Sequence, residues 1–141
     1  MNAPNLPPDL RDAVLLRLDA LPDEDRLCHG DFHPGNVLLT VRGPIVIDWM
    51  TAKHGNPIAD VARTLMLLTI DTPPSILERT IVKFARDAFV ETYLEYYFKS
   101  RPGNRDQVET WKPIIAAARL NERIDGEREA LIGMIRAGLK G

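Results

Sequence analysis

One stretch of eight residues, HGDFHPGN at positions 29–36, constrains the fold of this chain more than any other. Its proline and two glycines interrupt helices and strands, so the stretch is predicted to be a loop. Two apolar runs, Val37–Val41 and Ile45–Ile47, follow it and predict a β-hairpin whose turn contains Gly43 and Pro44. A polar loop that leads straight into a hairpin is therefore the first expected feature of the fold.

Helical patterns surround this loop and hairpin. Before the loop, Leu10, Val14 and Leu18 recur at a spacing of four residues, which predicts a helix that begins after Pro7. Four more helices are expected later, from their capping residues and apolar patterns. The first of them begins at Asn56-Pro57. The second begins at a capping box of Ser75 and Glu78 and has one apolar face, made of Leu77, Ile81, Phe84 and Ala88. After a polar loop, SRPGNRDQ, the last two cover Pro113–Leu120 and Glu127–Ala137. The expected class is α+β, mostly helical, with a helical subdomain over 57–139.

Composition narrows the classes of function. A chain of 141 residues is expected to form a single domain, 1–141. Its 18 basic and 20 acidic side chains argue against a nucleic-acid binder, because phosphates require a concentrated basic surface. The lone Cys28 cannot form an intrachain disulfide, and the sequence contains neither an export signal nor an apolar run long enough to span a bilayer. A cytoplasmic protein without nucleic-acid or membrane partners is therefore expected.

Three side chains in and after the loop have the spacing of a phosphoryl-transfer site. Asp31 is followed five residues later by Asn36, and Asp48 comes directly after the hairpin. Protein-kinase catalytic loops have the same order, H-x-D-x₄-N and then a metal-binding aspartate. In such a site one carboxylate accepts the proton of the attacking hydroxyl, while an amide and a second carboxylate hold Mg²⁺ against the phosphates. We therefore expect the loop and the hairpin to bring these three side chains together.

The segments LCHGDFHPGNVLL, VIDWMTA and GNPIADVARTL also resemble the aminoglycoside phosphotransferase and choline-kinase-like superfamily. The resemblance implies a protein-kinase-like fold and an enzyme that uses Mg²⁺ and ATP (or GTP) to phosphorylate a hydroxyl group on a small molecule. It also implies a role for five residues. Asp31 is the catalytic base, Asn36 and Asp48 are metal ligands, and His29 and Asp60 support the catalytic loop.

The chain departs from this family pattern at several positions. Gly30 stands where protein kinases carry the arginine of H-R-D, and Asp48-Trp49-Met50 replaces D-F-G, which fits a small-molecule kinase. No glycine precedes Gly30, so no Gly-rich phosphate loop is expected. The resemblance then implies a truncated enzyme that consists of the C-terminal lobe alone, with the N-terminal nucleotide lobe absent. Either a homo-oligomer or a partner that supplies the missing lobe is expected.

Two other interpretations of the same residues remain open. The chain could be a catalytically inactive kinase-lobe remnant that acts as an interaction module through exposed apolar surface. Alternatively, His29, Asp31 and His33 form an H-x-D-x-H pattern that could hold a metal ion for hydrolysis. The acceptor is open as well, because acidic and basic side chains are nearly equal in number between residues 71 and 141, which does not indicate a pocket for cationic aminoglycosides.

Overall fold

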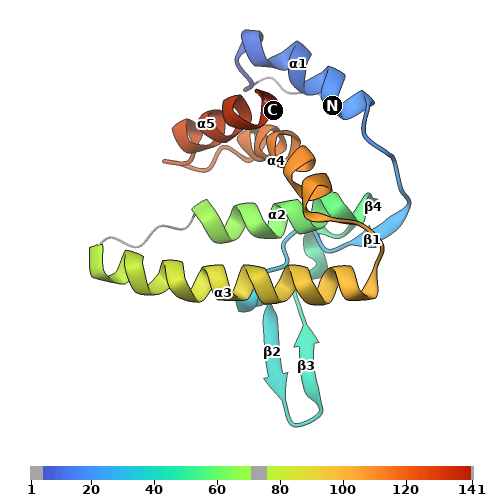
Figure 1. Cartoon of the computed structure of the whole chain (residues 1–141), viewed down its shortest axis with the longest axis vertical. Coiled ribbons are helices and arrows are strands. Elements are labelled where there is room, and N and C mark those ends of the chain that lie inside the picture. The colour runs from blue at the N-terminus through green and yellow to red at the C-terminus, as the bar shows by residue number, and fades with distance from the viewer. Residues whose placement is uncertain (1–4, 71–75, 141) are drawn as a thin grey trace.

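A computed structural model describes residues 5–70 and 76–140 of the chain, with side chains after the gap described from residue 82. Within these ranges it contains five α-helices and two small antiparallel sheets, which confirms the mostly helical α+β class and the expected number of helices. The helices are α1 (Pro8–Asp19), α2 (Pro57–Ile70), α3 (Ile76–Ser100), α4 (Arg105–Arg119) and α5 (Arg128–Leu139), and the strands are β1 (Arg26–Cys28), β2 (Val37–Thr40), β3 (Gly43–Val46) and β4 (Lys53–Gly55). The hairpin of β2 and β3 projects away from the helices (Figure 1).

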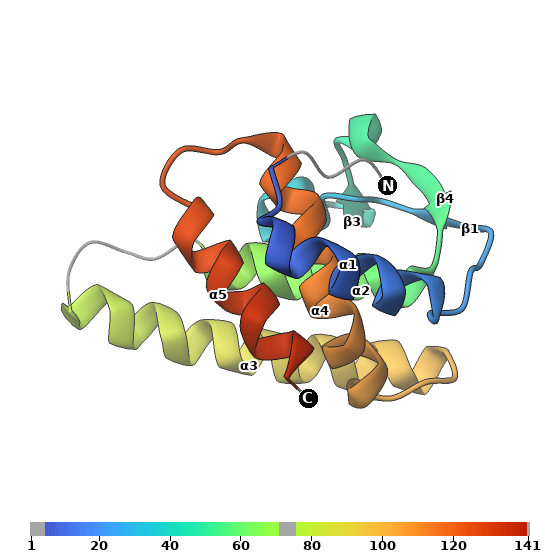
Figure 2. The same cartoon turned by 90° about the horizontal axis from the view of Figure 1, so that it is seen from above.

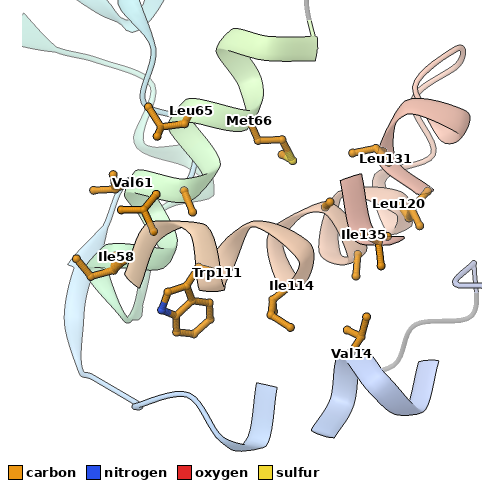
Figure 3. Close-up of a cluster of buried hydrophobic side chains, with 14 of the residues drawn as sticks. Val14, Ile58, Val61, Leu65, Met66, Trp111, Ile114, Leu120, Leu131 and Ile135 are labelled. Atoms are coloured by element: carbon orange, nitrogen blue, oxygen red, sulfur yellow. The ribbon is translucent and has the colours of Figure 1, made fainter. Parts of the chain in front are cut away.

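The hydrophobic core lies where α4 packs against α2, α5 and α1 (Figure 3). Val14, Val61 and Ile135 come from three of these helices and are almost completely buried, and burying a side chain of this kind stabilises the fold by roughly 1.5–3 kcal/mol. Figure 2 shows α1 and α5 side by side over α4. Arg17 of α1 also donates a hydrogen bond of 2.9 Å to the carbonyl oxygen of Gly138 in α5. The first helix is thus held in place by the last one.

The longest helix, α3, packs through a different face from the predicted one. Tyr93 and Leu94 point toward the core, whereas Phe84 is 78% exposed and Ala88 is exposed as well, so the prediction that places Phe84 and Ala88 on the apolar face is wrong. A residue distant in sequence contributes to this packing face, since Phe32 stacks on Tyr93 with ring centroids 5.8 Å apart. The predicted capping box of Ser75 and Glu78 and the side chains of Leu77 and Ile81 lie outside what the structure describes. Neither α3 nor any other helix in the described ranges is long and apolar enough to cross a membrane.

Helix α4 begins eight residues before its predicted start at Pro113. The Asn104 side chain accepts a hydrogen bond of 3.1 Å from the backbone N–H of Gln107, and the Gln107 side chain accepts one of 2.9 Å from the backbone N–H of Asn104. This reciprocal pair caps the helix inside the segment predicted to be a loop. Pro113 therefore lies within the helix, where buried Val108 and Ile114 on either side of it face the core. Tertiary packing overrides the usual preference of proline for the first turn.

The β-hairpin is present as predicted, but its turn is placed differently. Thr40 lies opposite Gly43, so the turn consists of Val41 and Arg42, and the prediction that Gly43 and Pro44 form the turn is wrong because both belong to β3. The side chain of Thr40 explains the shift. Its hydroxyl accepts a hydrogen bond of 3.1 Å from the backbone N–H of Arg42 and donates one of 2.8 Å to the carbonyl oxygen of Gly43.

The second sheet joins β1 to β4, with Leu27 opposite His54. The sequence does not predict these strands, because segments of three residues are too short to show a periodic pattern. Their pairing brings the start of the polar loop, at residue 29, close to the segment that leads into α2. This sheet therefore sets where the loop meets the first turn of that helix.

Candidate active site

The polar loop is fastened to α2 at its first two residues. The carboxylate of Asp60, in the first turn of α2, accepts hydrogen bonds of 2.8 Å from the backbone N–H groups of both His29 and Gly30. Hydrogen bonds to an ionised carboxylate are stronger than neutral ones, and two of them on neighbouring amides fix the direction of the chain. Asp60 thus binds the start of the loop at two neighbouring amides, the contact that the family resemblance implies for it.

His29 joins the loop to the end of the hairpin. It is 5% exposed, and its Nε2 lies 2.9 Å from the carbonyl oxygen of Ile47, while its Nδ1 accepts a hydrogen bond of 3.2 Å from the backbone N–H of Asp31. Because Nδ1 accepts, the proton must lie on Nε2, which donates to Ile47. The ring also packs against Trp49, with centroids 4.6 Å apart. Both ring nitrogens are therefore occupied by the protein backbone.

Asn36 holds the proposed catalytic base in position. Its Nδ2 donates a hydrogen bond of 2.8 Å to the backbone carbonyl oxygen of Asp31 and one of 3.2 Å to the Asp31 carboxylate. Asn36 is buried, whereas the side chain of Asp31 remains 30% exposed. The carboxylate is also 3.7 Å from Nε2 of His33. The Asn36 amide thus holds Asp31 at both its backbone and its carboxylate. The carboxylate remains accessible to solvent.

The hairpin returns Asp48 to the loop, as the spacing predicts. The backbone N–H of Ile47 donates a hydrogen bond of 2.9 Å to the carbonyl oxygen of Asn36, so the residue before Asp48 lies directly beside Asn36. Asp48 itself adopts a left-handed backbone conformation with φ 59°, which few residues other than glycine, asparagine and aspartate adopt readily. Its side chain is exposed and forms no hydrogen bond within the described part of the chain.

A network of charged side chains that the sequence does not predict continues from the loop. Arg63 of α2 donates a hydrogen bond to the carbonyl oxygen of Gly30 and another, 2.7 Å long, to the carboxylate of Glu122. Glu122 also binds Arg119, which donates two hydrogen bonds to Glu127 at 2.8 and 2.9 Å. Burial raises the pKa of Glu122, but Arg63 and Arg119 together outweigh it, so this pKa is lowered. A charged residue within the apolar helix α2 is the signal that could have identified Arg63.

A cavity of about 1130 Å³ opens beside Asp31. It lies among the loop, the second half of α2, the exposed side of α3 and the segment before α5. Its walls include Asp31 and His33 of the loop, Leu67 and Leu68 of α2, Arg86 and Phe89 of α3, and Asp125, Gly126 and Glu127 before α5. The predicted base thus faces a space large enough for a small molecule.

Asn36, at the end of the loop, and Asp48, after the hairpin, keep oxygen atoms that could hold a magnesium ion. The Asn36 amide nitrogen is committed to Asp31, while its Oδ1 accepts no hydrogen bond from any described residue, and the Asp48 carboxylate is equally uncommitted. Amide and carboxylate oxygens are the ligands that Mg²⁺ prefers, with waters and phosphates completing its shell. These two residues therefore offer oxygen atoms of the kind that Mg²⁺ binds, and their role as its ligands stays a prediction.

The His-based metal site is not formed. Both ring nitrogens of His29 contact the backbone, and Nδ1 of His33 accepts a hydrogen bond of 3.1 Å from the backbone N–H of Gly35. Among residues 5–70 and 82–140, whose side chains the structure describes, no group of three or more His, Cys, Asp and Glu side chains could hold a metal ion. The structure therefore gives no support to hydrolysis through His29, Asp31 and His33.

Comparison with known proteins gives one match. The model of the phosphotransferase enzyme family matches residues 1–111, a range that contains the loop, the hairpin, α2 and α3. No curated protein and no solved structure matches the chain significantly.

Proposed function

This chain belongs to the phosphotransferase enzyme family, and we propose that it transfers the γ-phosphoryl group of a nucleoside triphosphate to a hydroxyl group on a small molecule. The observation that carries the proposal is the environment of Asp31. Its carboxylate is fixed by Asn36, remains accessible and lines a cavity of about 1130 Å³. A carboxylate that only stabilises a turn needs neither the hydrogen bond from Asn36 nor a place in the wall of a cavity.

In the proposed reaction the acceptor enters the cavity with its hydroxyl group directed at Asp31. The hydroxyl oxygen attacks the γ-phosphorus, the bond from that phosphorus to the bridging oxygen breaks, and the hydroxyl proton passes to the Asp31 carboxylate. Asn36 holds the carboxylate in one orientation, and Asp60, His29 and Arg63 hold the backbone on which it stands. Positioning of this kind supplies most of the rate in phosphoryl transfer.

Asn36 and Asp48 would hold Mg²⁺ through the amide oxygen and the carboxylate. When bound there, the ion would neutralise charge on the phosphates of ATP or GTP. Among the described residues, neither Oδ1 of Asn36 nor the carboxylate of Asp48 has a hydrogen-bond partner, which supports this assignment. The hydrogen bond from the backbone N–H of Ile47 to the carbonyl oxygen of Asn36 would keep Asn36 and Asp48 at a constant separation.

The proposal is tested by replacing Asp31 with asparagine, which keeps the shape of the side chain and removes its basicity. Asp31→Asn is expected to retain calorimetric binding of Mg·ATP and to lower Mg²⁺-dependent ADP formation, with a pool of small alcohols present, by about 100-fold or more. Asp12→Asn makes the same change on the exposed side of α1 and is expected to leave both quantities unaltered. Equal ADP formation in the wild type and in Asp31→Asn would refute the assignment of the base.

A second candidate function is favoured by the apolar side chains that remain exposed on the hairpin and the turn after it. They are Leu38, Leu39, Val41, Ile45, Trp49 and Met50. Contiguous exposed apolar surface is typical of sites where proteins associate. The chain could thus be a kinase-lobe remnant that acts as an interaction module or forms a homo-oligomer through this surface.

A further inference from the structure

The charged side chains around the cavity differ in how well they are paired. We propose that Arg86 binds a carboxylate of the acceptor, so that the substrate is a hydroxylated compound with an apolar body and an acidic group. Only one part of this inference rests on the proposed function, namely that the hydroxyl group of the ligand accepts phosphate. Arg86 can bind an acid whether or not phosphate is transferred.

Arg86 carries a guanidinium group with open hydrogen-bonding positions. Its side chain is 23% exposed, and its described contacts are a 3.4 Å hydrogen bond from Nη1 to the carbonyl oxygen of Leu68 and a 3.9 Å approach of Nε to the Asp87 carboxylate. Asp87 forms a much closer pair with Lys83, at 2.5 Å. A guanidinium has five N–H donors and is costly to bury without a strong partner. Most of these donors are therefore available to a ligand.

The other charges of the cavity are either paired or solvated. Arg119 is paired with both Glu122 and Glu127 through three hydrogen bonds, two of them to Glu127. Asp125 is exposed, where water screens its charge, and Asp31 faces the hydroxyl group in the proposed reaction. Among the described residues that line the cavity, Arg86 is thus the cation with the most unused binding capacity.

Arg86 and Asp31 share the cavity with apolar side chains. Leu67 and Leu68 of α2 and Phe89 of α3 line the cavity together with these two charged residues. A ligand that fits this lining carries a hydroxyl group at one end, an aliphatic or aromatic body, and an anionic group at the other end. A carboxylate suits the guanidinium because the planar fork of Arg86 can donate two parallel hydrogen bonds to it.

Three para-substituted benzyl alcohols with the same body test this inference. They are para-(hydroxymethyl)benzoate, its neutral amide and the corresponding cationic benzylamine, and binding to the full chain is measured by ligand-observed NMR titration. The benzoate is expected to bind about tenfold more tightly than the amide, because hydrogen bonds to charged groups stabilise more than neutral ones. Arg86→Gln is expected to remove that preference, and Arg11→Gln, an exposed arginine of α1, to preserve it.

Four results would overturn the inference: tightest binding by the benzylamine, no saturable binding of the benzoate, an unchanged preference in Arg86→Gln, or displacement of the benzoate by Mg·ATP. The last would assign Arg86 to the phosphates of the nucleotide. Binding of the benzoate with no ADP formation under any condition would instead refute the proposed function and leave the acid site standing. The two failures are thereby distinguished.

Discussion

At the scale of single residues, Gly30 shows why the loop has its sequence. Its backbone φ of +81° is one that side chains rarely allow, and a Cβ atom there would lie 2.6 Å from the carbonyl oxygen of Thr51. The Thr51 hydroxyl in turn donates a hydrogen bond of 2.9 Å to the carbonyl oxygen of His29. The position therefore excludes the arginine that protein kinases carry there, for reasons of backbone and packing together.

Gly30→Ala is expected to lower the free energy of unfolding by about 2–4 kcal/mol, since it adds both left-handed strain and a backbone clash. Gly126→Ala is the matched control, because φ there is +82° but no atom lies within 4 Å of the added Cβ. Gly126→Ala is expected to lower the free energy of unfolding by about 1 kcal/mol. Urea unfolding of the two variants gives the difference, and equal losses at the two positions would show that the contact with Thr51 is unimportant.

The candidate residues could be predicted from the sequence because they lie in one short motif. Asp31 and Asn36 are five residues apart, and a hairpin of ordinary length returns Asp48 to them, so local spacing places all three. Arg63 could not be assigned in this way. Its partners, Gly30 and Glu122, are 33 and 59 residues away in the sequence, and contacts over such separations depend on how whole helices pack.

At the scale of secondary structure, helices were easier to predict than their boundaries. Periodic apolar residues gave the number of helices, whereas the start of α4 depends on the reciprocal hydrogen bonds of Asn104 and Gln107. Asn104, the capping residue of α4, lies in a segment rich in turn-forming residues. Pro113 is a second residue at which a helix could begin, and the prediction placed the start of α4 there. The packed face of α3 was missed because its packing includes contacts with residues distant in sequence, such as the stacking of Tyr93 on Phe32.

The cap of α4 gives a prediction at this scale. Asn104→Ala removes the side-chain acceptor and is expected to reduce the free energy of unfolding by about 1 kcal/mol. It should also speed amide hydrogen exchange at Gln107, whose N–H loses its partner. Asn104→Ser retains a capping oxygen, so its free energy of unfolding is expected to fall much less than that of Asn104→Ala. Identical stability of the alanine and serine variants would mean that the capping bonds do not contribute.

At the scale of the whole molecule, the exposed hairpin predicts self-association. Leu39 is 88% exposed and Val41 is fully exposed, so charging both should weaken association without disturbing the core. Light scattering at increasing concentration is expected to show dimers for the wild type and monomers for the double variant Leu39→Lys, Val41→Lys. Leu16→Lys, at an apolar site on α1 that is 74% exposed, is the control and should still associate. A wild type that stays strictly monomeric at high concentration would contradict the interaction surface.

The bond between Arg17 and Gly138 has a consequence for how the molecule assembles during translation. Helix α1 leaves the ribosome well before α5, yet its packing partners are α4 and α5. Contacts between residues far apart in sequence form slowly, because a long intervening chain must first be ordered. The apolar face of α1 around Val14 therefore stays uncovered until α4 and α5 have been synthesised. Chaperones that bind nascent chains would find their target at this helix.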